Sequence, residues 1–298
     1  MMSVARHPTA TAAGTTPHGA RQGGRAAEEA ERRSNPGVQI ATEFVEPTPR
    51  RIRVRLGDTL VADSTRAQLL IQYGPGGLPT YYVPRQDVRP GVLVEETIGS
   101  EGQRTWAVMA GRKRADAAAW THENPTGALA ALADHVSFSW RQLEWYEEDE
   151  RVLVHARDPY KRVDTLRSSR RVQVLVAGEQ VANSIRPLLL LETSLPIRYY
   201  LPFEDVRTDL LEASDTVTIC PYKGRARYWS IRVGDTFVRD AAWSYPDPIP
   251  ENPKIRDLLC FFNERVDLVV DGHPLERPVT PWSNPDPDTD IGVAHLRR

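Results

Sequence analysis

The stretch Leu195-Pro-Ile-Arg-Tyr-Tyr-Leu-Pro202 decides the fold, because a near copy of it, Leu78-Pro-Thr-Tyr-Tyr-Val-Pro84, stands earlier in the same chain. The flanking segments repeat as well. Matching pairs are Val61-Ala-Asp-Ser64 with Val181-Ala-Asn-Ser184, Asp87-Val-Arg89 with Asp205-Val-Arg207, Trp106 and Trp120 with Trp229 and Trp243, and Phe138 with Phe261. The similarity exceeds the roughly 20–50 residues of a solenoid unit. It predicts a duplicated domain.

The composition of the chain favours a soluble globular protein and argues against some partners. Its 298 residues leave room for about two domains, and 40% hydrophobic and 26% charged residues are typical of a soluble globular protein. A net charge of -2 gives no basic footprint for nucleic acid. No apolar run approaches the roughly 18 residues of a membrane span. We therefore expect neither nucleic acid nor a membrane as a partner.

The two cysteines, Cys220 and Cys260, do not form a disulfide framework, which fits a reducing cytoplasm. The chain contains no Cys-x-x-Cys pair and no His-Glu-x-x-His motif, so the sequence predicts no metal site, and no cofactor is evident.

Five segments follow from the repeat and from local composition. Residues 1–50 are rich in Ala, Thr, Gly, Arg and Pro, and we expect them to be disordered. The first copy spans residues 51–150, a linker spans 151–169, and the second copy spans 170–277. Residues 278–298 read as a loose tail, although Trp282 is a candidate to dock on the body. The polar linker stretch from His155 to Arg162 is interpreted as a domain-docking linker, and covering a pocket is its alternative role.

Period-two alternation predicts that each copy begins with a strand pair. Ile52, Val54 and Leu56 alternate with arginines before a turn at Gly57-Asp58, and Val172, Val174 and Val176 precede a turn at Ala177-Gly178. Towards the end of each copy, apolar spacing predicts one helix, over 128–140 and over about 252–263, and then a final strand. The expected fold class is mainly β, with a few helices: two tandem small curved β-sheet domains, each closed by one C-terminal helix.

Several ungapped blocks carry a resemblance to a known family. These blocks are Glu192-Thr-Ser-Leu-Pro-Ile-Arg-Tyr-Tyr-Leu-Pro202, Asp205-Val-Arg207, Cys220-Pro-Tyr-Lys-Gly224, Tyr228-Trp229 and Ala242-Trp-Ser-Tyr-Pro246. They resemble the domain-of-unknown-function 427 family; the second copy matches nearly throughout, and the first is degenerate. The resemblance implies a β-tent-like domain, related to the ligand-binding domain of cereblon and to methionine sulfoxide reductase B. The family carries a nucleotidyltransferase label but supplies no catalytic residues to transfer.

The copies differ in their polar residues rather than in their scaffold. Twenty-one residues separate Arg207 from Trp229, but only sixteen separate Arg89 from Trp106, and the extra segment is Cys220-Pro-Tyr-Lys-Gly224. The first copy also has Gln72 for Glu192, Thr80 for Arg198 and His122 for Tyr245. This split is typical of one working site and one structural copy.

The sequence therefore predicts a small-molecule site in the second copy, for an anionic or planar ligand. Candidate ligand-binding residues are Arg198, Tyr199, Tyr200, Tyr222, Lys223, Trp229, Trp243 and Tyr245. Arginine offers a fork for carboxylate or phosphate, and aromatic rings wall a pocket for a planar group. If a reaction occurs, Cys220 is the candidate nucleophile or redox group, because a nearby cation favours a thiolate, and Glu192 is the candidate acid or base.

Plainer interpretations stand beside these. Cys220-Pro-Tyr-Lys-Gly224 reads as a tight hairpin turn with a solvated lysine, Glu192 and Arg198 as a salt bridge, and Asp205-Val-Arg207 as a structural turn. The rival function is a non-catalytic module that binds a protein partner. A third, nucleotidyl transfer, needs clustered carboxylates for magnesium, and Asp286, Asp288 and Asp290 are the nearest cluster.

Overall fold

The structure, a computed structural model, describes residues 43–73, 77–99, 103–122, 124–283 and 294–295. Most of the predicted disordered segment, and the aspartates of the tail at 286, 288 and 290, lie outside these residues. Among the described residues, no helix is long and apolar enough to cross a membrane.

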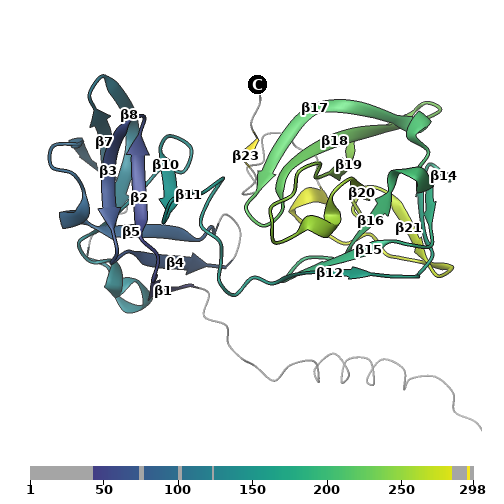
Figure 1. Cartoon of the computed structure of the whole chain (residues 1–298), viewed down its shortest axis with the longest axis horizontal. Coiled ribbons are helices and arrows are strands. Elements are labelled where there is room, and N and C mark those ends of the chain that lie inside the picture. The colour runs from purple at the N-terminus through teal and green to yellow at the C-terminus, as the bar shows by residue number, and fades with distance from the viewer. Residues whose placement is uncertain (1–42, 74–76, 100–102, 123, 284–293, 296–298) are drawn as a thin grey trace, which may run out of the picture. The chain divides into compact units, whose positions relative to one another are not determined.

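The first copy consists of two antiparallel sheets (Figure 1). Its strands are β1 (Glu43–Pro47), β2 (Ile52–Leu56), β3 (Thr59–Ser64), β4 (Gln68–Gln72), β5 (Thr80–Pro84), β6 (Leu93–Ile98), β7 (Arg104–Ala110), β8 (Lys113–Thr121), β9 (His135–Phe138), β10 (Glu144–Glu147) and β11 (Glu150–Arg151). Two 3-10 turns, η1 (Arg85–Asp87) and η2 (Gly127–Leu132), connect them. The larger sheet has the order β1-β4-β5-β9-β8-β7-β6, and the smaller one has the order β11-β10-β2-β3.

The second copy repeats this plan strand for strand. Its strands are β12 (Val163–Arg167), β13 (Val172–Val176), β14 (Glu179–Ser184), β15 (Leu188–Glu192), β16 (Arg198–Pro202), β17 (Leu211–Cys220), β18 (Gly224–Val233), β19 (Thr236–Ser244), β20 (Leu258–Phe261), β21 (Asp267–Val270) and β22 (His273–Pro274), with β23 (Ala294–His295) added at the edge beside β17. The orders β12-β15-β16-β20-β19-β18-β17 and β14-β13-β21-β22 correspond to those of the first copy. The predicted duplication is confirmed.

Strand alternation and turn residues explain the hairpins that begin each copy. Ile52, Val54 and Leu56 are buried, while the intervening arginines are half-exposed. In the second copy, Ala177 (φ 50°) and Gly178 (φ 80°) both adopt positive φ, as a two-residue hairpin turn requires. The Asp-Val-Arg segments are structural in both copies. Asp87 accepts a hydrogen bond from Ser64 Oγ, and Asp205 accepts one from Ser184 Oγ, each at 2.7 Å.

The helices predicted at the end of each copy are wrong. The first segment is the 3-10 turn η2 followed by strand β9, and the second is the 3-10 turn η5 (Pro253–Ile255) followed by strand β20. In β20 the apolar residues alternate between two buried faces: Leu259 and Phe261 lie in one core, and Cys260 lies in another. A strand that is buried on both sides reads as a continuous apolar run, which periodicity alone does not distinguish from a helix.

Two predicted boundaries also shift. Strand β1 begins at Glu43, inside the segment predicted to be disordered, and pairs with β4. Strand β12 lies inside the predicted linker and pairs with β15. Each copy therefore begins about eight residues earlier than the repeat suggested, because the first strand of each copy forms an edge and carries little apolar signal.

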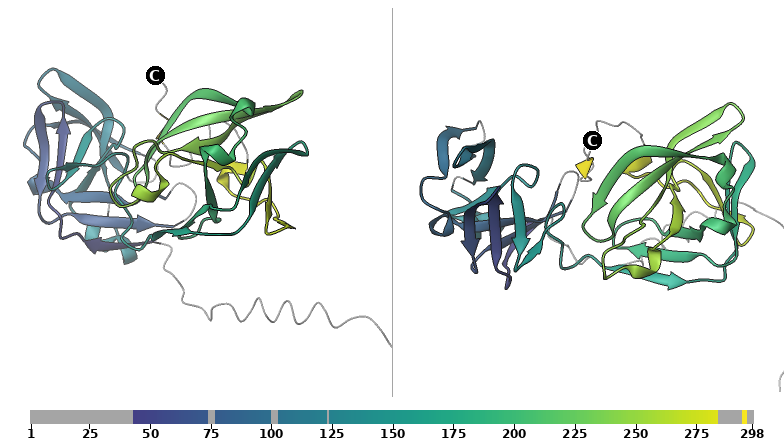
Figure 2. Two further views of the ribbon diagram at one scale, coloured as in Figure 1. Left: turned by 45° about the vertical axis from the view of Figure 1, so that its right-hand side comes forward. Right: turned by 45° about the horizontal axis from the view of Figure 1, so that its top comes forward.

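The larger sheet of the second copy separates two apolar clusters. One fills the space between the larger and smaller sheets and includes Val174, Leu201 and Leu268. The other, the outer cluster, lies on the opposite face and includes Tyr200, Trp243, Tyr245 and Cys260. The large sheet curls between β17 and β12, as Figures 1 and 2 show from three directions. Three further 3-10 turns, η3 (Phe203–Asp205), η4 (Thr208–Leu210) and η6 (Pro281–Ser283), complete this copy.

Candidate functional site

The predicted aromatic residues divide between the two faces of the larger sheet. Tyr199 and Trp229 belong to the core between the sheets, where the Trp229 ring packs 5.6 Å from that of Phe203. Tyr200, Trp243 and Tyr245 lie together in the outer cluster. Neighbouring residues of a strand point to opposite faces, so the Tyr-Tyr pair contributes only one ring to the outer cluster. We therefore build the candidate site from this face alone.

An extended hairpin brings the copy-specific segment to this face. The last register pair of β6 and β7 is Ile98 with Arg104, whereas β17 and β18 continue to Cys220 with Gly224. Lys223 N–H donates to the Cys220 carbonyl at 3.3 Å across the turn. The predicted hairpin turn is confirmed. Gly224 has φ 106°, and a Cβ atom there would lie 3.1 Å from the Asp247 carbonyl oxygen. This positive φ and close approach strongly favour glycine.

The turn is held from outside by a neighbouring loop and by the linker. Asn252 Nδ2 donates to the Tyr222 carbonyl at 2.7 Å, and Ile249 N–H donates to the Lys223 carbonyl at 3.1 Å. From the linker, Asp158 N–H donates to Tyr222 Oη at 2.7 Å. These three bonds fix the turn so that the Lys223 side chain points inward, only 11% exposed. The plainer interpretation of Lys223 as a solvated turn lysine is therefore wrong.

Two ammonium groups share one buried carboxylate in what we call the lysine–glutamate cluster: Lys161, Glu192 and Lys223. Lys223 Nζ binds Glu192 Oε2, and Lys161 Nζ lies 3.1 Å from Glu192 Oε1. The Glu192 side chain is 5% exposed and that of Lys161 is 25% exposed. The Lys161 ammonium also lies 5.5 Å from the centre of the Tyr222 ring, within cation–π range.

The ionised forms of Glu192 and Lys223 stabilise each other. Burial alone would raise the pKa of Glu192, but the ammonium groups of Lys223 and Lys161 outweigh it and lower that pKa. Burial likewise would lower the pKa of Lys223, yet the neighbouring Cys220 sulfur and Glu192 carboxylate raise it. Glu192 and Lys223 are therefore both ionised at neutral pH, and Lys161 places a second ammonium group beside the same carboxylate.

Lys161 is the member of this cluster that the sequence did not single out. It stands in the linker, 31 residues before Glu192. The polar composition of the linker was the available signal, but composition does not identify which cation turns inward. The Cys220 thiol, next to Lys223, is partly exposed, whereas Cys260 is fully buried, and burial raises the pKa of Cys260 to about 12.

Arg198 does not pair with Glu192, so the predicted salt bridge between them is wrong. Its guanidinium instead makes a bidentate pair with Glu264, Nη1 to Oε2 at 2.7 Å and Nη2 to Oε1 at 2.8 Å. Both side chains are buried, 8% and 0% exposed. The guanidinium lies within 6 Å of the rings of Trp243, Phe262 and Trp282. Its fork is thus occupied within the protein.

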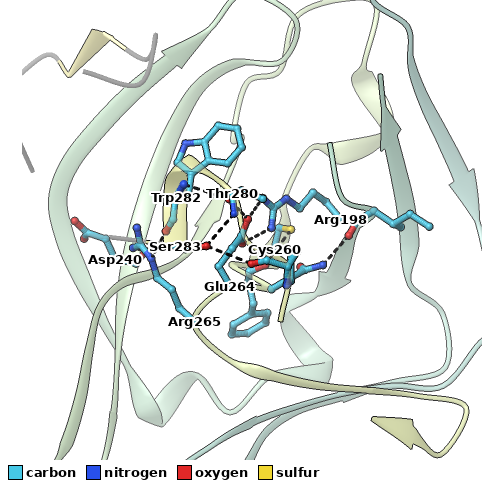
Figure 3. Close-up of polar contacts among 12 residues, drawn as sticks. Arg198, Asp240, Cys260, Glu264, Arg265, Thr280, Trp282 and Ser283 are labelled. Carbon is cyan, nitrogen blue, oxygen red and sulfur yellow. Dashed lines mark hydrogen bonds and ion pairs between the residues drawn. The ribbon is translucent and has the colours of Figure 1, made fainter. Parts of the chain in front are cut away.

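The C-terminal segment, residues 278–283, packs against the Arg198–Glu264 pair (Figure 3). Thr280 Oγ1 donates to Glu264 Oε1 at 2.6 Å, and Arg265 Nε donates to the Trp282 carbonyl at 3.2 Å. The predicted docking of Trp282 on the body is confirmed. Arg198 therefore serves to hold the chain's own C-terminal segment, whereas the lysine–glutamate cluster is not part of that contact.

The first copy lacks the residues that contact this segment. Because Phe138 and Phe261 pair with equivalent strand positions, the counterparts of Phe262, Glu264 and Arg265 are Ser139, Arg141 and Gln142. Part of the polar difference between the copies is therefore explained by the C-terminal segment. In contrast, the aromatic framework is shared: Trp243 Nε1 donates to Tyr200 Oη, and Trp120 Nε1 to Tyr82 Oη, both at 3.1 Å.

Comparison with known proteins agrees with the duplication. A family model described as "Domain of unknown function (DUF427)" matches the chain twice, at residues 44–149 and 164–272. The two matches begin next to β1 and β12, at the boundaries that the structure gives. No curated protein matches the chain.

Replacing Lys223 by methionine should destabilise the second copy by about 3 kcal/mol at pH 7. The reason is that the buried carboxylate of Glu192 keeps only one cation of the cluster, Lys161. In the native protein the pKa of Glu192 lies below its value in the unfolded chain. The ionised carboxylate therefore contributes its full stabilisation at any pH above the unfolded-state pKa, and this stabilisation is lost as the pH falls through the native-state pKa. In the variant the pKa of Glu192 rises, so the difference in stability between the native chain and Lys223→Met should shrink towards pH 4. Urea unfolding monitored by hydrogen exchange of peptides from residues 164–272 measures both.

Lys254→Met is the matched control, since Lys254 is exposed and donates one hydrogen bond, to the Thr165 carbonyl. It should change stability by less than about 0.5 kcal/mol. Equal effects of the two substitutions, or a deficit that does not depend on pH, would contradict the ionised buried pair.

Replacing Thr280 by valine should weaken the attachment of the C-terminal segment, because Glu264 loses a charge-assisted hydrogen bond worth about 1.5 kcal/mol. Hydrogen exchange of residues 278–283 should accelerate about tenfold while the rest of the second copy is unchanged. Thr208→Val, at an exposed threonine of η4, is the control. Unchanged exchange in Thr280→Val would show that the contact does not hold the segment.

Proposed function

We propose that this chain, which belongs to the DUF427 family in two tandem copies, binds a small anionic molecule at the lysine–glutamate cluster of its second copy. The observation that carries the proposal is the sharing of one buried carboxylate by two ammonium groups. The Glu192–Lys223 pair is neutral, so Lys161 supplies the excess charge. Because Lys161 is the most exposed member, an anion reaches it first.

The surroundings favour a compact ligand with a carboxylate or phosphate group. The excess charge lies at the edge of a low-dielectric aromatic cluster, where an ion pair is stronger than in water. Tyr200 and Tyr245 are buried, and burial raises the pKa of both phenols, so they stay neutral. The Tyr222 ring is partly exposed and lies beside Lys161, so apolar surface adjoins the cation. The ligand thus combines an anionic group with a small planar body.

The candidate catalytic residues receive different roles in this proposal. A carboxylate whose pKa is lowered is a poor proton acceptor at neutral pH, so Glu192 positions the two lysines rather than acting as acid or base. Cys220 is partly exposed beside Lys223 and is the group available for covalent chemistry. Ligand binding does not require such chemistry, and the reaction class stays open.

The test uses Cys220 as a built-in reporter, because Cys260 is buried and the chain has two cysteines. Small carboxylates and phosphate monoesters are screened for slower alkylation of Cys220 by iodoacetamide, and for a rise in melting temperature. A ligand at about 100 times its Kd should add about 2.7 kcal/mol to stability.

Lys161→Gln should weaken a true ligand at least tenfold, whereas Lys254→Gln should not. A ligand that protects Cys220 equally in both variants would refute the role of Lys161. Protection by no carboxylate or phosphate would refute the anion site as a whole.

A second candidate function is a non-catalytic interaction module, and one observation favours it. Residues 278–283 already contact the second copy as a short peptide, with Thr280 bonded to Glu264 and Trp282 over Arg198. A partner with a similar hydroxyl and aromatic pair would bind the same residues. Capture of a peptide that displaces the C-terminal segment, without protection of Cys220, would favour this module over the anion site.

A further inference from the structure

The first copy contains a polar hollow on its surface, although its sequence predicted a purely structural copy. The hollow measures about 540 Å³, within the ~300–1,000 Å³ range of small-molecule sites. It lies beside η1 and the start of β9, far in sequence from the lysine–glutamate cluster. It is lined by Arg66, Gln68, Pro84, Arg85, Gln86, Asp134 and His135.

The two arginines of the hollow are exposed, and each contacts neighbouring groups. Arg66 Nη2 donates to Asp87 Oδ1 at 2.5 Å. With the Gln86 amide turned so that its oxygen faces Arg66, that oxygen accepts from Nη1 at 2.8 Å and from Nη2 at 3.0 Å. The Arg85 guanidinium lies 5.2 Å from the centre of the Trp106 ring. Such contacts reduce the conformational entropy that a cation loses when an anion binds.

The other polar residues of the hollow suit hydroxyl groups. His135 Nδ1 lies 2.7 Å from the Ala133 carbonyl oxygen, so Nδ1 donates there and Nε2 is the ring nitrogen left for a ligand. Asp134 is the one carboxylate among the described lining residues, and Gln68 adds an amide. A hydroxyl donates well to both the imidazole and the carboxylate, whereas a second anionic group would be repelled by Asp134.

The second copy provides an internal control, because it keeps Arg186 and Asp257 at the positions of Arg66 and Asp134 but has lost other polar residues of the hollow. Strand register equates Gln68 with Leu188, and His135 with Leu258. The positions of Arg85 and Gln86 are taken by Phe203 and Glu204. Phe203 contacts Trp229 in the same way as Arg85 contacts Trp106, so the packing is kept while the charge is absent. The scaffold therefore does not require Gln68, Arg85 or His135, whereas the arginine–aspartate pair of Arg66 recurs in the second copy.

We infer that the first copy binds a phosphorylated, hydroxyl-bearing small molecule, such as a sugar phosphate, in this hollow. Arg85 binds the phosphate by its guanidinium fork, and Arg66, which is already bonded to Asp87 and Gln86, adds the N–H groups that those two partners leave unused. His135, Asp134 and Gln68 bind the hydroxyl groups. The inference does not depend on the proposed function, since it concerns the other copy and other residues.

Calorimetric titration of the full-length chain with inorganic phosphate, ribose 5-phosphate and ribose tests this inference. Ribose 5-phosphate should bind at least tenfold more tightly than phosphate, because it engages the residues that bind hydroxyl groups as well as the arginines, and ribose alone should show no heat of binding. Arg85→Phe should weaken ribose 5-phosphate at least tenfold. This variant recreates the Phe203–Trp229 pair of the second copy, so we expect it to fold.

Two further variants make the result unambiguous. Asp134→Asn should tighten phosphate binding, because it removes the one carboxylate of the described lining, and Arg186→Gln, at the second-copy counterpart of Arg66, should change nothing. Equal binding of ribose 5-phosphate to the native chain and Arg85→Phe would overturn the inference. Failure of ribose 5-phosphate to bind the native chain at millimolar concentration and 10-fold molar excess would also overturn it. So would a loss of ribose 5-phosphate binding in Lys161→Gln rather than in Arg85→Phe.

Discussion

The buried carboxylate of Glu192 is the constraint on which the second copy's candidate site depends. A carboxylate that is 5% exposed is costly unless cations neutralise it, and here two lysines do so from different segments. Lys223 reaches it from an extended hairpin, and Lys161 reaches it from the linker. The length of the hairpin, the close approach at Gly224 and the course of the linker are all consistent with this requirement.

Duplication separates what the fold needs from what each copy adds. Both copies keep the strand order, the Asp-Val-Arg hydrogen bonds and the tryptophan-to-tyrosine hydrogen bond. The second copy adds the lysine–glutamate cluster and the Arg198–Glu264 pair that holds residues 278–283. The first copy adds Arg85 and His135 around its hollow. The two copies have therefore diverged on different parts of the same scaffold.

The sequence could predict the strands and the shared framework, because alternation and repetition are local signals. It also placed Tyr200, Trp243, Tyr245 and Cys220 in one candidate site, but the same set included Tyr199 and Trp229, which lie on the other face of the sheet. It could not predict the partners of the charged residues. Arg198 lies 66 residues from Glu264, and Glu192 lies 31 residues from both of its lysines, so the pairing depends on how distant strands meet.

The predicted helices failed for a related reason. Strand β20 is apolar on both faces because two clusters pack against it, and the sequence carries no mark of that second cluster. Similarly, Tyr199 and Tyr200 are adjacent and look equivalent in sequence, yet the pleat sends them to different cores. Which face of a sheet becomes a site is decided by the segments that cover it.

The most direct test of this account is a carbon-13 NMR titration that follows the side-chain carboxyl of Glu192 in the full-length chain. Two ammonium groups should hold the pKa of Glu192 below that of an ordinary glutamate, and Lys161→Gln should raise it. A Glu192 that titrates at or above the ordinary value of about 4.3, unaffected by Lys161→Gln, would contradict the shared ion pair and the anion site built upon it.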